Sequence, residues 1–152
     1  MDAIVTTLDI ACPPDEVFAV ATDPTRFAEW QSDVVRVETD RPAPLPVGGR
    51  FTTIRRIGGV ERAIAQRVAE TTRPHRWAAR SDTGPIRPQA TITIDPLDGG
   101  AGSRVTFTLD YVGHGIGVPL LPLVRRQTRR AAPASYRRLK ELLESRAGGR
   151  PA

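Results

Sequence analysis

Residues 50–71 read RFTTIRRIGGVERAIAQRVAET and carry the strongest structural signal in the chain. Apolar and β-branched residues alternate with polar ones on both sides of Gly58-Gly59, which is typical of two strands joined by a tight turn. A type I′ turn needs positive φ at both central residues, which glycine adopts without strain. The stretch therefore predicts a β-hairpin with strands over 51–57 and 60–71, in which Ile57 pairs with Val60.

That pairing fixes the register of the whole hairpin. The pairs that follow are Arg55–Arg62, Thr53–Ile64 and Phe51–Gln66. One face of the hairpin carries Phe51, Thr53, Ile57, Val60, Ile64 and Val68. The other face carries Arg50, Thr52, Arg56, Glu61 and Arg67. A slip of one residue would turn the charges inward, so the first face is predicted to be buried.

Five further segments have strand character. They cover residues 3–10, 34–39, 76–81, 89–94 and 104–112. No helical pattern interrupts the chain between the second and the seventh strand, so neighbouring strands joined by short turns must be antiparallel. The same alternation predicts an inward face formed by Ile92, Ile94, Val105, Phe107, Leu109 and Tyr111.

Three helices are predicted around this sheet. Proline and acidic residues at 13–16 favour the start of a short helix that runs to Val20, and Thr22-Asp23-Pro24 starts a second one that ends near Trp30. A long amphipathic helix covers residues 118–146, and Pro133 is expected to kink it. Its apolar stripe consists of Leu120, Leu123, Val124, Gln127, Ala131, Ala134, Ser135, Leu139, Leu142 and Leu143.

Length and composition indicate one ordinary globular domain. The chain has 152 residues, of which 39% are hydrophobic and 26% charged. We expect a single domain over residues 1–147 and a flexible tail over 148–152. The lone Cys12 excludes a disulfide framework and a cysteine-built zinc site. No metal-ligand cluster, phosphate-binding loop or dinucleotide fingerprint is present, so neither a metal nor another cofactor is predicted.

The chain is basic, with 22 Lys and Arg against 17 Asp and Glu. All but one of the basic residues are arginine, and this bias favours a compositional origin over a dedicated binding surface. One local cluster consists of Arg125, Arg126, Arg129 and Arg130. No secretory signal is visible, and the longest apolar stretch, 115–124, is about half of a membrane span. These features predict a cytoplasmic protein without a membrane span.

Several short motifs add a family resemblance. They are ACPPDEVF at 11–18, Asp23-Pro24, Trp30, PVGGRF at 46–51 and LKELLE at 139–144. In this order and spacing the chain resembles the START-like, birch-allergen-like (SRPBCC) superfamily, and within it the polyketide cyclase/dehydrase group of bacterial proteins. The resemblance implies an α+β helix-grip fold. In that fold a curved seven-stranded antiparallel sheet with two short helices grips a long C-terminal helix over an apolar cavity.

The predicted cavity gives a set of candidate ligand-binding residues. They are Trp30, Phe51, Arg55, Arg62, Ile64, Trp77, Ile92, Phe107, Tyr111 and Ala131. Small residues in the middle of the long helix leave volume unfilled, although they could equally let helix and sheet approach closely. Aromatic residues on inner faces also serve core packing alone. The hydroxyl of Tyr111 is a candidate hydrogen-bond donor to a ligand carbonyl.

Arg55 and Arg62 are two like charges side by side on the inner face. Buried arginines need an anionic partner, so they could bind a carboxylate, enolate or phosphate of a ligand at the cavity mouth. They could instead extend to solvent at the end of the sheet. His75 is expected to be solvated in a turn. His114 follows the last strand and is a weak candidate for acid–base work, since no carboxylate lies at a spacing that would orient it.

Three functional hypotheses follow. The leading one is binding of a small hydrophobic ligand, such as a lipid, a polyketide or a related aromatic molecule, in the cavity between sheet and helix. The second is an enzyme of the polyketide cyclase/dehydratase type that uses Arg55, Tyr111 and His114, although the resemblance transfers no catalytic residue. The third is an RNA- or ribosome-associated protein that uses the arginine cluster of the long helix. Nothing in the sequence decides between a monomer and a dimer.

Overall fold

The computed structural model describes residues 3–148, and the side chains of residues 3–145. The strands are β1 (Ile4–Ile10), β2 (Val34–Thr39), β3 (Arg50–Ile57), β4 (Val60–Thr72), β5 (Arg76–Arg80), β6 (Ile86–Leu97) and β7 (Gly102–Gly113). The helices are α1 (Pro14–Ala21), α2 (Phe27–Trp30) and α3 (Leu121–Gly148), with short 3₁₀ turns η1 (Pro24–Arg26), η2 (Asp98–Gly100) and η3 (Gly115–Gly117). The predicted tail begins at the last residue of α3, and residues 149–152 lie outside the described part.

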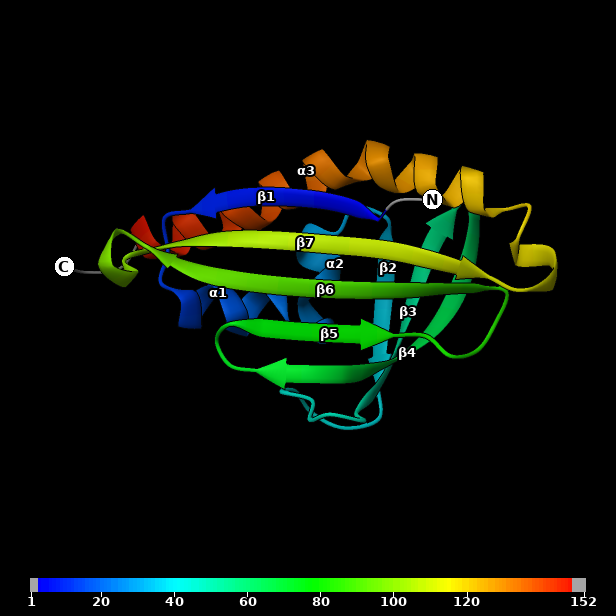
Figure 1. Ribbon diagram of the computed structural model, residues 1–152, viewed down its shortest axis with the longest axis horizontal. Helices are drawn as coiled ribbons and strands as arrows, with labels where there is room; N and C mark the ends of the chain where they lie inside the picture. Colours follow the sequence, from blue (N-terminus) through cyan, green and yellow to red (C-terminus); the bar gives the residue numbers. More distant parts are fainter. Residues whose placement is uncertain (1–2, 149–152) are drawn as a thin grey trace.

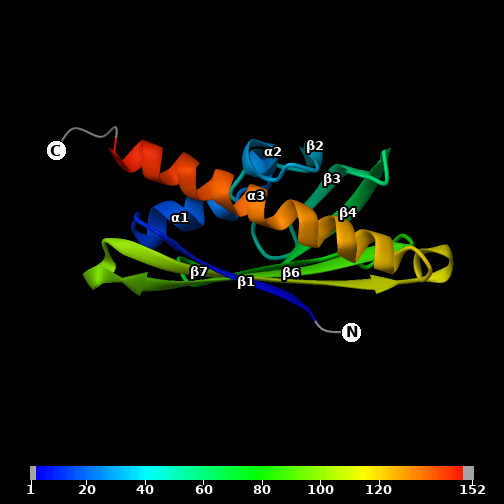
Figure 2. The same ribbon diagram turned by 90° about the horizontal axis from the view of Figure 1, so that it is seen from above.

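The strands form one antiparallel sheet in the order β1-β7-β6-β5-β4-β3-β2. The sheet bends: β3 and β4 run obliquely to β6 and β7 (Figure 1), and the view in Figure 2 shows them standing away from the plane of those strands. Figure 2 shows α1, α2 and α3 on the same side of this sheet, with α3 lying along its length. The predicted α+β architecture, with two short helices and a long terminal helix over a seven-stranded antiparallel sheet, is confirmed.

The hairpin that the sequence predicts has the predicted register. Ile57 pairs with Val60 and Arg55 with Arg62, and the turn glycines Gly58 and Gly59 have φ of +61° and +81°. One expectation about its faces is wrong, because the Val60 side chain is 53% exposed. It lies at the hairpin tip, where its partner Ile57 is buried but Val60 itself is not covered.

The long helix differs from its prediction in which side chains face the sheet. Leu123 is 46% exposed and Ala134 is also exposed, although both belong to the predicted stripe. Arg125 is only 5% exposed, because its guanidinium pairs with Asp110 at 3.1 Å. The helix continues through Pro133, and the expected kink at this residue stays a prediction. The apolar pattern did not predict the burial of Arg125, because an arginine that is paired with a carboxylate can occupy a position on the inner face of the helix.

The largest hydrophobic cluster joins α1, α2, the sheet and the C-terminal half of α3. At its centre Phe27 meets Phe51 and Trp77 edge to face, with ring centroids 6.0 and 6.1 Å apart. On α3, Leu139 and Leu143 are at most 1% exposed. A second, smaller cluster lies near the β3–β4 hairpin tip and the start of α3, and it contains Ile57, Ile64, Ile86 and Val124.

Candidate functional site

A cavity of about 100 Å³ lies between α3 and the concave side of the sheet. Trp30, Trp77, Ile92 and Phe107 of the larger hydrophobic cluster line it from one side. From the other side it is lined by Ile57, Ile64 and Val124 of the smaller cluster. The cavity therefore lies where the two clusters fail to meet.

The middle of α3 explains why this space is unfilled. Ala131, Ala132 and Ser135 all line the cavity, and each has a short side chain where a leucine would reach the sheet. Leucines return only one turn later, at Leu139. Small residues over a curved sheet leave a void because the neighbouring side chains cannot collapse into it fully.

Eight of the ten predicted site residues line this cavity. They are Trp30, Arg55, Ile64, Trp77, Ile92, Phe107, Tyr111 and Ala131. Phe51 does not line it, and its ring packs against Phe27 and Trp77 within the aromatic cluster. Arg62 does not line it either, although it pairs with Arg55 across β3 and β4. Contact of these residues with a ligand stays a prediction.

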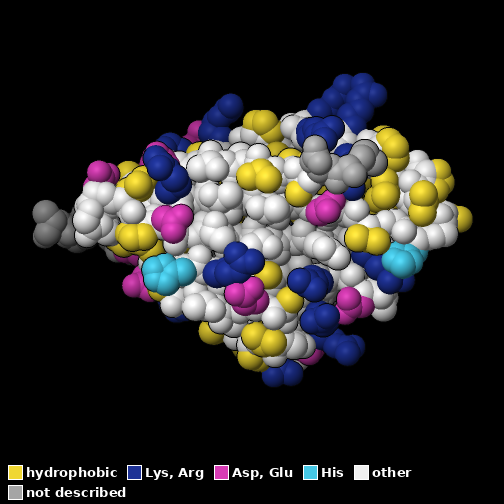
Figure 3. All heavy atoms as spheres, viewed as in Figure 1, with side chains coloured by type: hydrophobic (Ala, Val, Ile, Leu, Met, Phe, Trp, Pro, Cys, Tyr) yellow, Lys and Arg dark blue, Asp and Glu magenta, His cyan; other side chains and the backbone are white. Residues whose placement is uncertain are grey.

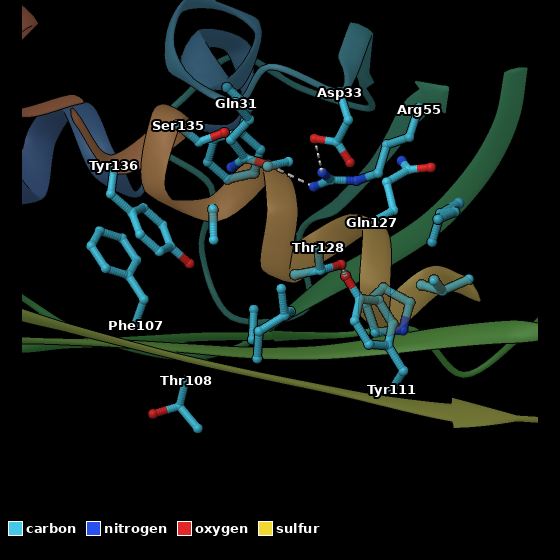
Figure 4. A pocket seen from close by; sticks show the side chains of 18 of the residues that line it. Gln31, Asp33, Arg55, Phe107, Thr108, Tyr111, Gln127, Thr128, Ser135 and Tyr136 are labelled. Carbon is cyan, nitrogen blue, oxygen red and sulfur yellow. Dashed lines mark hydrogen bonds and ion pairs between the residues drawn. The ribbon is translucent and has the colours of Figure 1, made fainter. Parts of the chain in front are cut away.

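Arg55 meets neither of the two expectations stated for it. Its guanidinium donates hydrogen bonds to the Asp33 carboxylate at 3.0 Å and to the Gln31 side-chain oxygen at 2.7 Å (Figure 4). The Arg55 side chain is 20% exposed, so it does not extend fully to solvent. Its pairing with Asp33 means that it does not need an anion from a ligand. The protein itself supplies the carboxylate, which lowers the free-energy cost of keeping a guanidinium at an apolar cavity.

Tyr111 also has a partner of its own. Its hydroxyl lies 2.6 Å from the Thr128 hydroxyl on α3. Burial is the main cause that raises the pKa of Tyr111 above the ordinary tyrosine range. The hydroxyl that the sequence analysis assigned to a ligand is therefore already engaged between sheet and helix.

The unpartnered hydroxyl belongs to Tyr136, which the sequence analysis did not select. Its ring stacks on Phe107 with centroids 4.1 Å apart, and Figure 4 shows its hydroxyl pointing into the cavity. It makes no hydrogen bond within the described part of the chain. Burial raises the pKa of Tyr136 to about 12, so the hydroxyl keeps its proton and can donate at neutral pH.

The indole N–H of Trp30 is a second donor without an acceptor. Trp30 lines the cavity, and its Nε1 is buried with no hydrogen-bond partner among the described residues. An unsatisfied buried donor costs about 1–3 kcal/mol, and native structures contain few of them. Trp30 is such a donor, and the Tyr136 hydroxyl beside the same cavity has no hydrogen-bond partner among the described residues either, although it is not fully buried. Together they indicate a place for hydrogen-bond acceptors that the chain itself does not provide.

The histidines contribute nothing to this site. His114 is exposed and absent from the cavity lining, and His75 is exposed in its turn as expected. Within residues 3–148 no group of three or more His, Cys, Asp or Glu side chains could hold a metal ion. The polar lining residues that were not predicted are Gln31, Asp33, Gln66, Thr91, Thr108, Gln127, Thr128, Ser135 and Tyr136.

The chain belongs to the family described as "Polyketide cyclase / dehydrase and lipid transport", which matches residues 1–144. The description of this family names both polyketide cyclisation and lipid transport. Among curated proteins, the chain is 32% identical over 120 residues to an uncharacterized protein of Mycobacterium tuberculosis, found in two strains. That match covers 72% of this chain and 47% of the relative, so the chain spans about half the length of the curated relatives it matches.

Solved structures share the fold at low sequence identity. The Zhui aromatase/cyclase of Streptomyces sp. R1128 superposes with a TM-score of 0.78 at 17% identity, covering 95% of this chain and 94% of that one. A START superfamily protein of Mycobacterium smegmatis gives 0.75 at 13% identity, covering 95% and 99%. The di-domain ARO/CYC BexL of the BE-7585A biosynthetic pathway gives 0.70 at 16% identity, covering 95% and 47%. These likenesses concern the fold.

None of the described helices is both long enough and apolar enough to cross a bilayer.

Proposed function

We propose that this protein binds a small, neutral aromatic molecule that carries a carbonyl group, in the cavity beneath α3. The single observation that carries the proposal is a pair of hydrogen-bond donors that face a largely aromatic and aliphatic cavity without a partner in the chain. The Tyr136 hydroxyl and the Trp30 indole N–H each lack an acceptor there. A ligand with an apolar body and an acceptor oxygen would satisfy the donor that it reaches, and it would lose its own water shell on entry.

The size of the cavity limits the ligand. A void of about 100 Å³ is smaller than the pockets of about 300–1,000 Å³ that hold drug-sized molecules. It is closer to an apolar cavity of about 150 Å³ that binds benzene. We therefore expect at most one aromatic ring to be enclosed, whereas a sterol or a long acyl chain would require α3 to move away from the sheet.

The charge of the cavity also limits the ligand. Arg55 is the cationic side chain of the lining, and the Asp33 carboxylate already neutralises it. A ligand carboxylate would have to compete with Asp33 for the guanidinium. The cavity therefore favours a neutral acceptor such as a ketone over a fatty-acid carboxylate.

Acetophenone and ethylbenzene provide a matched pair of probes, because they differ only by a carbonyl in place of a methylene. We expect acetophenone to bind the wild-type protein about threefold to tenfold more tightly, which is the value of one hydrogen bond. In Tyr136→Phe this preference should be lost. Tyr111→Phe is the matched control, because it removes a hydroxyl that Thr128 already engages and should leave the preference intact.

The measurement is ligand titration followed by NMR chemical shifts of the two tryptophan indole N–H groups, one of which lines the cavity without a partner. A wild-type protein that binds neither probe contradicts the proposal. Equal affinity for both probes contradicts the assigned role of the two donors. Circular dichroism of each variant checks that the fold is retained.

A second candidate function is catalysis of an aldol cyclisation, favoured by the Arg55–Asp33 pair at the cavity. In such a reaction Asp33 would accept a proton from a carbon between two carbonyl groups, and Arg55 would stabilise the enolate oxygen. The enolate carbon would then attack a second carbonyl of the same molecule, forming a carbon–carbon bond. The resulting alkoxide would recover the proton from Asp33, so that the aldol product forms without an external reagent.

The test of this candidate is turnover of a short linear poly-β-ketone, with products separated by chromatography. We expect wild-type protein to change the ratio of cyclised products, and Asp33→Asn and Arg55→Gln to abolish that change. His114→Ala is the control, since His114 does not line the cavity. Identical product ratios with and without the protein would exclude cyclase activity and leave the binding function untouched.

A further inference from the structure

One end of the molecule exposes aliphatic side chains that no core requires. Ile116 is 74% exposed, Val118 54%, Leu123 46% and Val60 53%. The first three follow one another between the end of β7 and the first turn of α3. Val60 lies at the β3–β4 hairpin tip, and Leu123 packs beside that tip, since its Cδ2 lies 3.4 Å from the position of a Cβ on Gly58.

Two hydrogen bonds hold this end together. The Gln127 side-chain oxygen accepts from the Gly58 backbone N–H at 3.0 Å, and its nitrogen donates to the Arg56 carbonyl at 2.6 Å. These two bonds join the hairpin tip to the start of α3. Figure 3 shows hydrophobic side chains gathered over the end where β7 leads into α3. We call the side chains of Val60, Ile116, Val118 and Leu123 the apolar end.

The helix that leaves the apolar end is strongly basic. Residues 111–140 contain six arginines and Lys140 but no aspartate or glutamate. Arg126, Arg129 and Arg130 are exposed, and Figure 3 shows basic side chains projecting beside the apolar end. A shallow surface groove is lined by Leu123, Arg126, Gln127, Arg130 and Ala131, which brings the apolar end and two of these arginines into one surface.

We propose that the apolar end is a docking surface for an anionic lipid bilayer. Aliphatic side chains flanked by arginines fit a membrane interface, where the former enter the acyl boundary and the latter meet lipid phosphates. Charge complementarity favours this occupant over a neutral bilayer. Nucleic acid would use the arginines but leaves Ile116 and Val118 without a role, since phosphate contacts need no exposed aliphatic side chain.

The docking surface lies next to the ligand cavity. The groove shares Gln127 and Ala131 with the lining of the cavity. A hydrophobic ligand could pass from a bilayer to the cavity through this region of α3 without crossing water. Docking itself rests on the surface side chains and does not depend on the ligand that the cavity binds.

The experiment is co-flotation of the full chain with vesicles of phosphatidylcholine containing 30% phosphatidylglycerol, against vesicles of phosphatidylcholine alone. We expect binding to the anionic vesicles that falls steeply in 0.5 M NaCl. Arg126→Gln with Arg130→Gln should weaken it about 25-fold, at about fivefold for each arginine. Ile116→Ser or Leu123→Ser should weaken it about tenfold or more.

Matched controls separate a local surface from net charge and general hydrophobicity. Arg36→Gln with Arg41→Gln removes the same charge from residues that are 60% and 54% exposed in β2 and the loop that follows it. Val47→Ser removes an aliphatic side chain that is 60% exposed before β3. Both controls should bind like wild type. Equal binding by test and control variants, absence of binding to anionic vesicles, or retention on RNA but not on vesicles would each overturn the proposal.

Discussion

The two ends of α3 meet very different surroundings. Toward its C-terminus, Leu139 and Leu143 are almost completely buried against α1 and the sheet. Toward its N-terminus, Val124 belongs to a smaller cluster, Leu123 is exposed, and a cavity separates that cluster from the main core. The same helix therefore packs tightly against the core at its C-terminal end and lines a cavity toward its N-terminal end.

This difference shows how a small domain can stay stable although it contains a cavity. The packed end supplies the burial that stabilises the fold, so the hollow end can keep short side chains at Ala131, Ala132 and Ser135. Polar groups that would be costly in the packed end, such as Arg55 and Asp33, also occur at the hollow end. Substitutions that act differently on the two ends test this division directly.

The largest effect is expected from Leu139→Ala at the packed end. Leu139 has no exposed surface, so its truncation removes buried contacts and leaves a new cavity. We expect the free energy of unfolding to fall by about 2–5 kcal/mol. Urea denaturation followed by circular dichroism measures it. A loss below about 1 kcal/mol would show that the C-terminal half of α3 is not tightly packed.

Filling space should affect the two ends in opposite ways. Ala79 is fully buried in β5, so Ala79→Leu should overpack the core and lower the free energy of unfolding by about 1–3 kcal/mol. Ala131→Leu adds the same atoms beside the void and should change stability by less than about 1 kcal/mol. It should also abolish binding of acetophenone. Equal destabilisation by the two substitutions would mean that the cavity is not open space.

The sequence was sufficient to predict the packed sheet but not the polar side of the cavity. The register of the β3–β4 hairpin follows from Gly58-Gly59 and alternation, both of which are local signals. Asp33 and Tyr136 were missed because their roles depend on which distant residues meet them. Asp33 lies just before β2 and reaches Arg55 only after that strand pairs with β3.

Arg125 is another residue whose surroundings depend on distant parts of the chain, and here a side chain expected to be solvated is buried. Its neighbours Arg126, Arg129 and Arg130 are solvated, as their spacing suggests, whereas Arg125 is buried by Asp110 and the Tyr111 carbonyl. Sequence alone did not identify this pairing. The predicted cluster therefore presents three arginines to solvent.

The environment of the two tyrosines gives a prediction specific to the cavity region. Tyr111 and Tyr136 are the only tyrosines in the chain, and burial raises the pKa of both, that of Tyr136 to about 12. The folded protein should therefore show little phenolate absorbance at pH 10, where an exposed tyrosine is half ionised. Because the folded-state pKa lies above the unfolded one, stability should be lost as the pH rises from about 10 toward about 12.

Spectrophotometric titration of the folded protein and of the protein in guanidinium chloride measures this difference. Tyr111→Phe and Tyr136→Phe assign the two transitions. Ordinary titration near pH 10 in the folded state would show that the hollow end admits water freely to both hydroxyls.

The smallest effect concerns two of the side chains that attach α3 to the rest of the chain, one near each end of the helix. At the packed end Glu144 accepts a hydrogen bond from the Ala11 backbone N–H at 2.8 Å, which is the main cause that lowers its pKa below 4.5. At the hollow end the neutral Gln127 binds the hairpin tip. The stabilisation from Glu144 should therefore be present above about pH 4.5 and lost as the pH falls through its lower folded-state pKa.

We expect Glu144→Gln to remove this acid-dependent part, so that wild type and variant differ by about 1 kcal/mol or less at pH 7 and converge below pH 4. Gln127→Ala should instead lower the free energy of unfolding by a similar amount at every pH, because an amide does not titrate. Urea denaturation of both variants at pH 7 and pH 3.5 distinguishes the two attachments. A pH-independent effect of Glu144→Gln would mean that the carboxylate charge plays no part in holding the packed end.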